Sequence, residues 1–293
     1  MKTPRRLLLL VPLLFVPGCA AAEVGEPPLK VLFIGNSYTS VNDLPSLLVA
    51  LAEAAGGRKI EADQYLVNSC TFERHVKDKK AIEKIRERKW DVVILQENSL
   101  QPILNRESMR RYARILHEEI SKQGAKTVFY LTWARQHIPQ MQEGADPATS
   151  PDYARAMYQI AGAAQAGDFN LWCQQHQRGL AGGLDGAYFD IAKELNATVA
   201  PVGMSWKRAL AVHPALVLHQ PDQSHPTPTG SYLAACVFYA TLFDKSPVGL
   251  PGELRKGIWA LVQIAPDEAK QLQEVAWQAV QEAKRCHGEK AGR

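Results

Sequence analysis

Three residues from two distant stretches of the chain have the types and spacing of a nucleophilic catalytic site. Ser37 follows the apolar run 31–34, and Asp222 and His225 stand three residues apart in the stretch HQPDQSHPTPTG. A serine hydroxyl becomes an effective nucleophile when a base takes its proton, and imidazole suits that task at neutral pH. A carboxylate on the second ring nitrogen fixes the tautomer and stabilises the imidazolium. The pattern predicts Ser37 as nucleophile, His225 as base and Asp222 as the residue that orients the base.

Simpler roles for Ser37 stay open at this point. Serine is favoured in turns and at helix N-caps, although Asn42 and Asp43 stand closer to the helix expected from residue 44 and are better caps. Gly35 could begin a phosphate-binding turn, but neither the GxGxxG nor the GxxxxGK pattern follows it. The nucleophile reading therefore depends on the distant Asp-x-x-His pair.

A metal site is the alternative for the histidine-rich stretch. His213, His219, Asp222 and His225 carry the imidazole and carboxylate groups that suit zinc. No H-x-x-x-H or C-x-x-C spacing supports such a site, and the apolar segment 214–218 would separate His213 from the others. We therefore expect neither a metal ion nor another cofactor.

Strand-like and helical segments alternate along the chain. Continuous apolar runs of four residues are typical of parallel strands that are buried on both faces. Strands separated by helices imply right-handed βαβ units and a mostly parallel sheet with helices on both sides. The expected strands are 31–34, 60–67, 92–95, 127–131 and 198–202, and the expected helices are 44–55, 81–88, 108–122, 153–164, 188–196, 204–211, 229–243 and 266–284.

Polar residues follow the first three expected strands. Ser37 comes after the first strand, the segment 68–71 after the second and the segment 96–99 after the third. Ligands of open α/β sheets bind beyond the carboxyl ends of the strands, so we expect one crevice formed by these segments. Asn98 could serve that crevice or satisfy a buried loop backbone, and Glu97 is expected to anchor a loop.

At these residues the chain resembles the SGNH (GDSL-like) hydrolases. GNS at 35–37 resembles their nucleophile block, with Asn where many members have Asp, and DQSH at 222–225 resembles the block that supplies acid and base. QEN at 96–98 lies where the family has Gly-x-Asn. The blocks stand in family order over residues 30–243, and DQSHPTPTGSYLAA and APVGMSW resemble an uncharacterised bacterial branch of the superfamily.

Two blocks depart from the family pattern. Ser69, or Asn68, would replace the backbone glycine of the second block, and Gln96 stands where the third block has glycine. A backbone amide survives such a substitution when the backbone can hold the same shape. The resemblance therefore implies an oxyanion hole made of the amides of Ser37 and Ser69 and the side chain of Asn98.

The fold and activity that the resemblance implies are those of a serine esterase on a flavodoxin-like three-layer α/β/α sandwich. Small acyl esters are the expected substrates, and the resemblance to this family favours O-acetyl groups on carbohydrate or cell-envelope molecules. The rival class is a non-catalytic surface lipoprotein that binds a glycan or peptide on the same fold. The sequence shows no basic patch with interleaved aromatics, so nucleic acid is not an expected partner.

The first 22 residues are expected to be a signal peptide. A basic start, MKTPRR, precedes an apolar run that is shorter than the roughly 20 residues of a typical membrane-spanning helix. The ending VPGC resembles a bacterial lipobox and makes Cys19 a candidate for lipidation, with ordinary cleavage near residue 22 or a retained membrane anchor as alternatives. Loss of this leader lowers the formal net charge from +4 to about +1. We expect a periplasmic or cell-surface protein whose contact with the membrane is an N-terminal lipid anchor.

One folded domain is expected after the leader. Its C-terminal part carries Trp259 and Trp277, which we expect to pack across one end of the sheet. The expected organisation is a linker at 23–28, an SGNH hydrolase-like domain at 29–286 with an insertion at about 135–186 that shapes the substrate rim, a helical tail at 250–286 within that domain, and a frayed end at 287–293.

Four cysteines remain beside Cys19. In an exported chain, Cys70, Cys173, Cys236 and Cys286 could form disulfides, but sequence does not give their connectivity. The apolar surroundings of Cys70 and Cys236 make buried free thiols an equal alternative.

Overall fold

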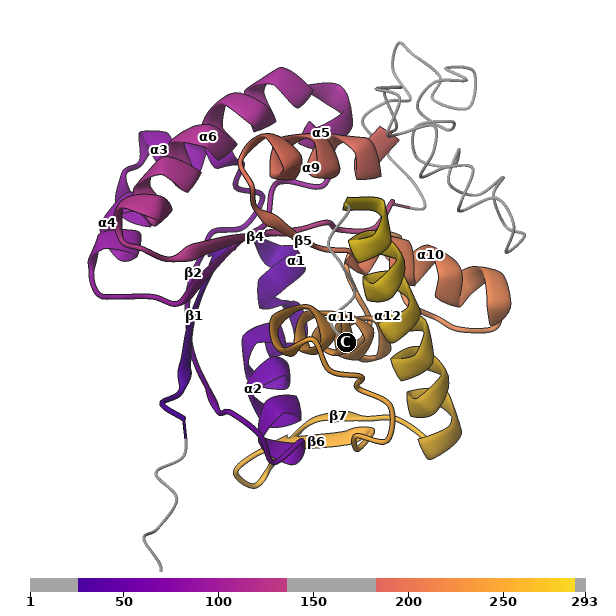
Figure 1. The fold of residues 1–293 in the computed structure, drawn as a ribbon. Helices are drawn as coiled ribbons and strands as arrows, with labels where there is room; N and C mark the ends of the chain where they lie inside the picture. Colours follow the sequence, from indigo (N-terminus) through magenta and orange to yellow (C-terminus); the bar gives the residue numbers. More distant parts are fainter. Residues whose placement is uncertain (1–25, 136–182, 288–293) are drawn as a thin grey trace, which may run out of the picture.

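Five parallel strands form the central sheet of this protein, in the order β2-β1-β3-β4-β5 (Figure 1). The computed structural model describes residues 26–135 and 183–287, so the expected leader, nearly all of the expected insertion and residues 288–293 lie outside the described residues. All five expected strands are present, with ends that differ by at most two residues. Their bounds are β1 Leu29–Gly35, β2 Ile60–Leu66, β3 Val92–Leu95, β4 Lys126–Tyr130 and β5 Thr198–Ala200.

Helices cover both faces of the sheet and complete the expected three-layer sandwich (Figure 1). Successive side chains of a strand point to opposite faces, so β1 sends Val31 and Phe33 into one core and Leu32 and Ile34 into the other. The first core lies under α2 Leu44–Ala54, α10 Val202–Val212, α11 Pro228–Phe243 and α12 Pro266–His287, and the second lies under α3 Phe72–Lys77, α4 Lys80–Arg86, α6 Arg106–Lys122 and α9 Gly183–Glu194. Three short helices, α1 Ser37–Ser40, η1 Val41–Asp43 and α5 Gln101–Leu104, complete the described set.

The strand order places a switch point between β1 and β3. The chain leaves β1 for β2 on one side and then crosses back to β3 on the other side, which opens a crevice at the carboxyl ends of these two strands. Ile34 pairs with Leu95, and the amide of Gln96 donates to the carbonyl of Ile34 at 2.8 Å. The residues that follow β1 and β3 therefore leave the sheet at the same level.

The segment after α11 corrects the expectation of a helical tail. Between α11 and α12 the chain forms an antiparallel hairpin of β6 Glu253–Lys256 and β7 Trp259–Gln263. Its Leu254 and Val262 reach the core, whereas Trp259 is exposed and does not pack across an end of the sheet. Trp277 of α12 does lie against the core, as expected.

The expected caps of α2 are also wrong. Asp43 precedes α2 with a left-handed backbone and no capping bond, and its carboxylate forms an ion pair with Lys256. Asn42 donates its side-chain amide to the carbonyl of Pro226 at 3.0 Å. Both side chains join segments that are distant in sequence. In the segment between β1 and α2, the capping side chain is Asn36, which caps α1.

Two of the four cysteines can be assigned. Cys70 and Cys236 are buried and free. Cys173 and the side chain of Cys286 lie outside what the structure describes.

Gly203→Ala should destabilise the fold. Gly203 lies in the first turn of α10, and a Cβ atom there would stand 2.2 Å from the backbone carbonyl oxygen of Thr132, just after β4. Overpacking against backbone costs about 1–3 kcal/mol, so the free energy of unfolding in urea should fall by that amount. Gly57→Ala is the matched control, because among the described residues the only atom within 4 Å of its added Cβ is the flexible Nζ of Lys245, at 3.9 Å. Equal stability of the two variants would contradict this packing.

Candidate active site

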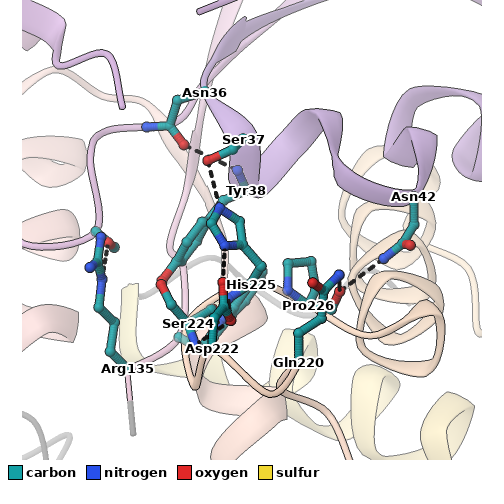
Figure 2. Close-up of polar contacts among 12 residues, drawn as sticks. Asn36, Ser37, Tyr38, Asn42, Arg135, Gln220, Asp222, Ser224, His225 and Pro226 are labelled. Atoms are coloured by element: carbon teal, nitrogen blue, oxygen red, sulfur yellow. Dashed lines mark hydrogen bonds and ion pairs between the residues drawn. The ribbon is translucent and has the colours of Figure 1, made fainter. Parts of the chain in front are cut away.

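The structure brings Ser37, Asp222 and His225 together at the carboxyl end of the sheet. The Ser37 hydroxyl lies 2.8 Å from Nε2 of His225, and Nδ1 of His225 lies 2.5 Å from Oδ2 of Asp222 (Figure 2). With the Nδ1 proton directed at the carboxylate, Nε2 can accept the serine proton. The hydrogen-bond reach predicted from sequence is therefore present, across 188 residues of chain.

Asp222 holds both the imidazole and the turn that carries it. Its Oδ1 accepts the backbone amides of Ser224 at 3.0 Å and His225 at 2.9 Å. Burial alone would raise the pKa of Asp222, but the hydrogen bonds from the His225 ring and from the two amides outweigh it and hold the pKa below its usual value. The carboxylate is thus ionised at neutral pH, as an orienting group must be.

The position of Ser37 follows from close packing where β1 ends. The amide of Asn36 donates to Oε1 of Gln96 at 2.9 Å, and the Asn36 side chain donates to the carbonyl of Cys70 at 3.0 Å. A Cβ atom at Gly35 would stand only 2.7 Å from the same Gln96 oxygen. Glycine at 35 is therefore required by the approach of Gln96, and Ser37 becomes the first residue of α1 rather than its cap.

Ser69 adopts the backbone conformation that favours glycine. Its φ is 56°, in the left-handed region, whereas Asn68 has no such φ. The Asn98 side-chain amide donates to the carbonyl of Ser69 at 3.4 Å, so the segments after β2 and β3 are adjacent as predicted. Of the two residues that could replace the family's glycine, Ser69 has the matching shape.

Glu97 anchors the loop after β2, as expected. It is buried, and its Oε1 accepts the amides of Phe72 at 3.0 Å and Asn98 at 2.6 Å. Burial raises the pKa of Glu97 to about 8, against the opposing effect of these hydrogen bonds. This buried carboxyl holds the backbone amides of Phe72 and Asn98.

Sequence reasoning missed an aromatic stack beneath the Asp-x-x-His turn. The Tyr38 ring stacks on Trp133 with centroids 4.7 Å apart, and Trp133 stacks on Trp206 at 3.9 Å. The Tyr38 hydroxyl lies 2.7 Å from Oγ of Ser224, and the indole N–H of Trp133 donates to the carbonyl of Ser224. Ser224, the residue before His225, is thus held both at its side-chain hydroxyl and at its backbone carbonyl. The signal available in sequence was the position of Trp133, two residues beyond the expected fourth strand.

Two further histidines support the strand exits. His75 is buried and its Nε2 lies 3.0 Å from the carbonyl of Gly35, while Nε2 of His219 lies 2.9 Å from the carbonyl of Ala134. Burial lowers the pKa of His75 to about 4 and also lowers that of His219, so both imidazoles are neutral at pH 7. Within 26–135 and 183–287, no group of three or more metal-ligating side chains occurs.

Arg135 lies beside the site, where the expected insertion begins. Its Nε donates to the hydroxyl of Ser99 at 2.9 Å, which ties the exit of β4 to the segment that carries Asn98 (Figure 2). The rest of the expected rim lies outside the described residues.

The free energy of unfolding should decrease as the pH rises from about 5 to 8, because of the raised pKa of Glu97. An unfolded glutamate has a pKa of about 4.3, so the folded chain holds a proton that the unfolded chain releases between that pH and about 8. This contribution is complete below the unfolded pKa and is lost as the pH rises through 8. Glu97→Gln keeps the acceptor oxygen but cannot titrate. Urea unfolding at pH 5, 6, 7 and 8 should show wild type losing stability relative to Glu97→Gln, and a constant difference between them would contradict the assignment.

Comparison with known proteins identifies the fold. No family model and no curated protein matches the chain. A DUF4886 family protein from Bacteroides uniformis matches with TM-score 0.58 and 18% identity, over 87% of this chain and 95% of that chain. A proposed SGNH hydrolase from Slackia heliotrinireducens matches with TM-score 0.51 and 22% identity, over 73% and 99%. An acetylxylan esterase from Geobacillus stearothermophilus matches with TM-score 0.50 and 16% identity, over 73% and 94%. The chain therefore has the α/β fold of the SGNH hydrolases, a five-stranded parallel sheet flanked by helices.

Proposed function

We propose that this protein is an exported serine esterase that removes small acyl groups, O-acetyl groups above all, from carbohydrate or cell-envelope molecules. The observation that carries the proposal is the continuous hydrogen-bond chain from Ser37 through His225 to Asp222. The fold supports it, because an acetylxylan esterase is among the solved structures that share it. Export is proposed from the N-terminal pattern MKTPRRLLLLVPLLFVPGC.

The proposed reaction is acyl transfer in two steps. Oγ of Ser37 attacks the ester carbonyl carbon while Nε2 of His225 takes the hydroxyl proton, and the C–O bond to the alcohol breaks as His225 returns that proton to the leaving oxygen. Water then attacks the acyl-serine in the same way, and the acid departs. Asp222 keeps the imidazole in its tautomer and stabilises its charged form during both steps.

The oxyanion of each step would be held by three donors. These are the backbone amides of Ser37 and Ser69 and the side-chain amide of Asn98. Glu97 holds the backbone amide of Asn98, and the Asn98 side chain donates to the carbonyl of Ser69. Such donors act on charge that develops in the transition state, so they raise kcat rather than substrate affinity.

Hydrolysis of 4-nitrophenyl acetate and of acetylated xylo-oligosaccharides should depend on Ser37. Ser37→Ala should lower kcat/KM by about a thousandfold or more, since the nucleophile is lost, and Asp222→Asn should lower it by roughly 10²–10⁴ because the tautomer is no longer fixed. Initial rates by absorbance and by released acetate measure both. Equal rates for wild type and Ser37→Ala would refute the triad and favour the non-catalytic glycan- or peptide-binding reading.

Ser69 and Asn98 should respond to mutation in different ways. Ser69→Gly keeps the backbone amide and suits the left-handed φ of 56°, so kcat should stay close to that of wild type. Asn98→Ala removes a side-chain donor and should lower kcat by roughly 10²–10³ with little change in KM. Steady-state kinetics on 4-nitrophenyl acetate separates kcat from KM. Loss of activity in Ser69→Gly would show that the hydroxyl, not the amide, is used.

A further inference from the structure

The tip of the β6–β7 hairpin carries two large apolar side chains that nothing in the described structure covers. Ile258 is 79% exposed and Trp259 is 73% exposed. The hairpin beneath them is fixed, because Leu254 and Val262 are buried in the core and the Arg255 guanidinium donates to the carbonyl of Ile258 at 2.9 Å. We call Ile258 and Trp259 the apolar tip. A rigid hairpin thus holds an isoleucine and a tryptophan in solvent, side by side.

The apolar tip lies at the end of the molecule where the chain enters the sheet. Gly257 of the hairpin turn lines the same groove as Ile60, and Ile60 pairs with Leu29, the first residue of β1. Figure 1 shows the hairpin and the start of β1 toward one end of the molecule and α1 toward the other. The hairpin and the carboxyl ends of the strands therefore lie toward different ends of the molecule (Figure 1), and the Lys256 side chain reaches from the hairpin to Asp43.

The N-terminal sequence indicates what meets this end. Leu29 stands ten residues after Cys19, the proposed lipidation site, and ten residues span at most about 36 Å. A lipid on Cys19 would hold the start of β1, and with it the apolar tip, within reach of a bilayer. A lipid on Cys19 fixes only one point of the chain, so a second contact by the apolar tip would set how the domain is oriented on the bilayer.

Charge at this end favours an apolar rather than an electrostatic contact. Arg255 pairs with Glu253, and Lys256 pairs with Asp43. The charged residues that line the groove beside the hairpin turn are three acids, Asp43, Glu53 and Asp63, and two bases, Arg255 and Lys256, which leaves a formal net charge of −1.

We propose that the apolar tip inserts into the interfacial layer of a lipid bilayer. Tryptophan suits that layer because its ring is largely apolar and its N–H can reach water, and isoleucine gains from leaving water. The contact would orient the protein with Ser37 turned away from the membrane, toward envelope substrates. It adds a membrane contact to the lipid anchor and is independent of the proposed esterase chemistry. Within the described residues, no helix is long and apolar enough to span a bilayer.

Vesicle binding tests the proposal directly. The chain without the proposed leader, residues 23–293, is sedimented with vesicles of phosphatidylethanolamine and phosphatidylglycerol, so that neither the apolar run of the leader nor a lipid on Cys19 can carry it to the bilayer. For the variant carrying Ile258→Ser and Trp259→Ser, the partition coefficient into vesicles should fall by about tenfold or more, because the burial of apolar surface is lost. Val217→Ser is the matched control, since Val217 is 69% exposed but lies outside the hairpin, and it should bind as the parent does.

A second readout reports insertion itself. Brominated lipids should quench part of the tryptophan fluorescence of the parent, and Trp259→Phe should keep vesicle binding while losing that quenching. High salt should leave binding largely intact. Equal partition of the parent and the double variant, or release of the parent by salt, would overturn the proposal.

Two other occupants would also overturn it. Dimers that are lost in the double variant, without vesicle binding by the parent, would assign the apolar tip to a second copy of the chain. Retention on insoluble xylan or peptidoglycan that the double variant loses, again without vesicle binding, would assign it to a glycan. Hydrolysis of 4-nitrophenyl acetate should be the same in all these variants, so failure here and failure of the proposed esterase activity are distinguishable.

Discussion

The side-chain carbonyl of Gln96 is the contact on which the active-site architecture depends. It accepts the amide of Asn36 and the hydroxyl of Thr39, and so joins the chain leaving β1 to the chain leaving β3. That approach is possible because Gly35 has no side chain. Ser37 is thereby placed by the pairing of two central strands rather than by a free loop. In the proposed mechanism, a nucleophile fixed in this way costs little reorganisation when a substrate arrives.

The other half of the site is built to the same standard from a segment nearly two hundred residues later. Asp222 orders its own turn through two backbone amides while it orients His225 through the ring. The stacked indole of Trp133 supports the turn from below, and Asn42 ties it to the segment that follows Ser37 through the carbonyl of Pro226. The same segments that carry the reacting groups therefore also bind to one another. This mutual support explains how two distant stretches of sequence keep a hydrogen bond of 2.8 Å between Ser37 and His225.

The sheet could be predicted from sequence because its signals are local, and the pairing of Ser37 with the Asp-x-x-His turn was predicted from residue types and from the resemblance to the SGNH hydrolases. Buried parallel strands are continuous apolar runs, and polar residues at their ends must meet at one edge. The hairpin could not be predicted, since β6 and β7 are short, mostly exposed and show no apolar alternation. Because a helix was expected in their place, Trp259 was expected to pack against the sheet. The left-handed φ of Ser69 depends on tertiary structure that a single sequence does not show. The same holds for Asn42 and Asp43, which bind distant segments instead of capping α2. Glu97 was predicted as an anchor, but its raised pKa follows from burial, which only the fold reveals.

The central claim is that Ser37 is an activated nucleophile, and covalent labelling tests it without knowledge of the substrate. A fluorophosphonate forms a stable bond to an activated serine with loss of fluoride. Intact mass spectrometry followed by peptide mapping should find one adduct per chain, on Ser37, and none in Ser37→Ala or His225→Ala. The account would be contradicted if folded wild-type protein stays unlabelled, or if the adduct persists in Ser37→Ala.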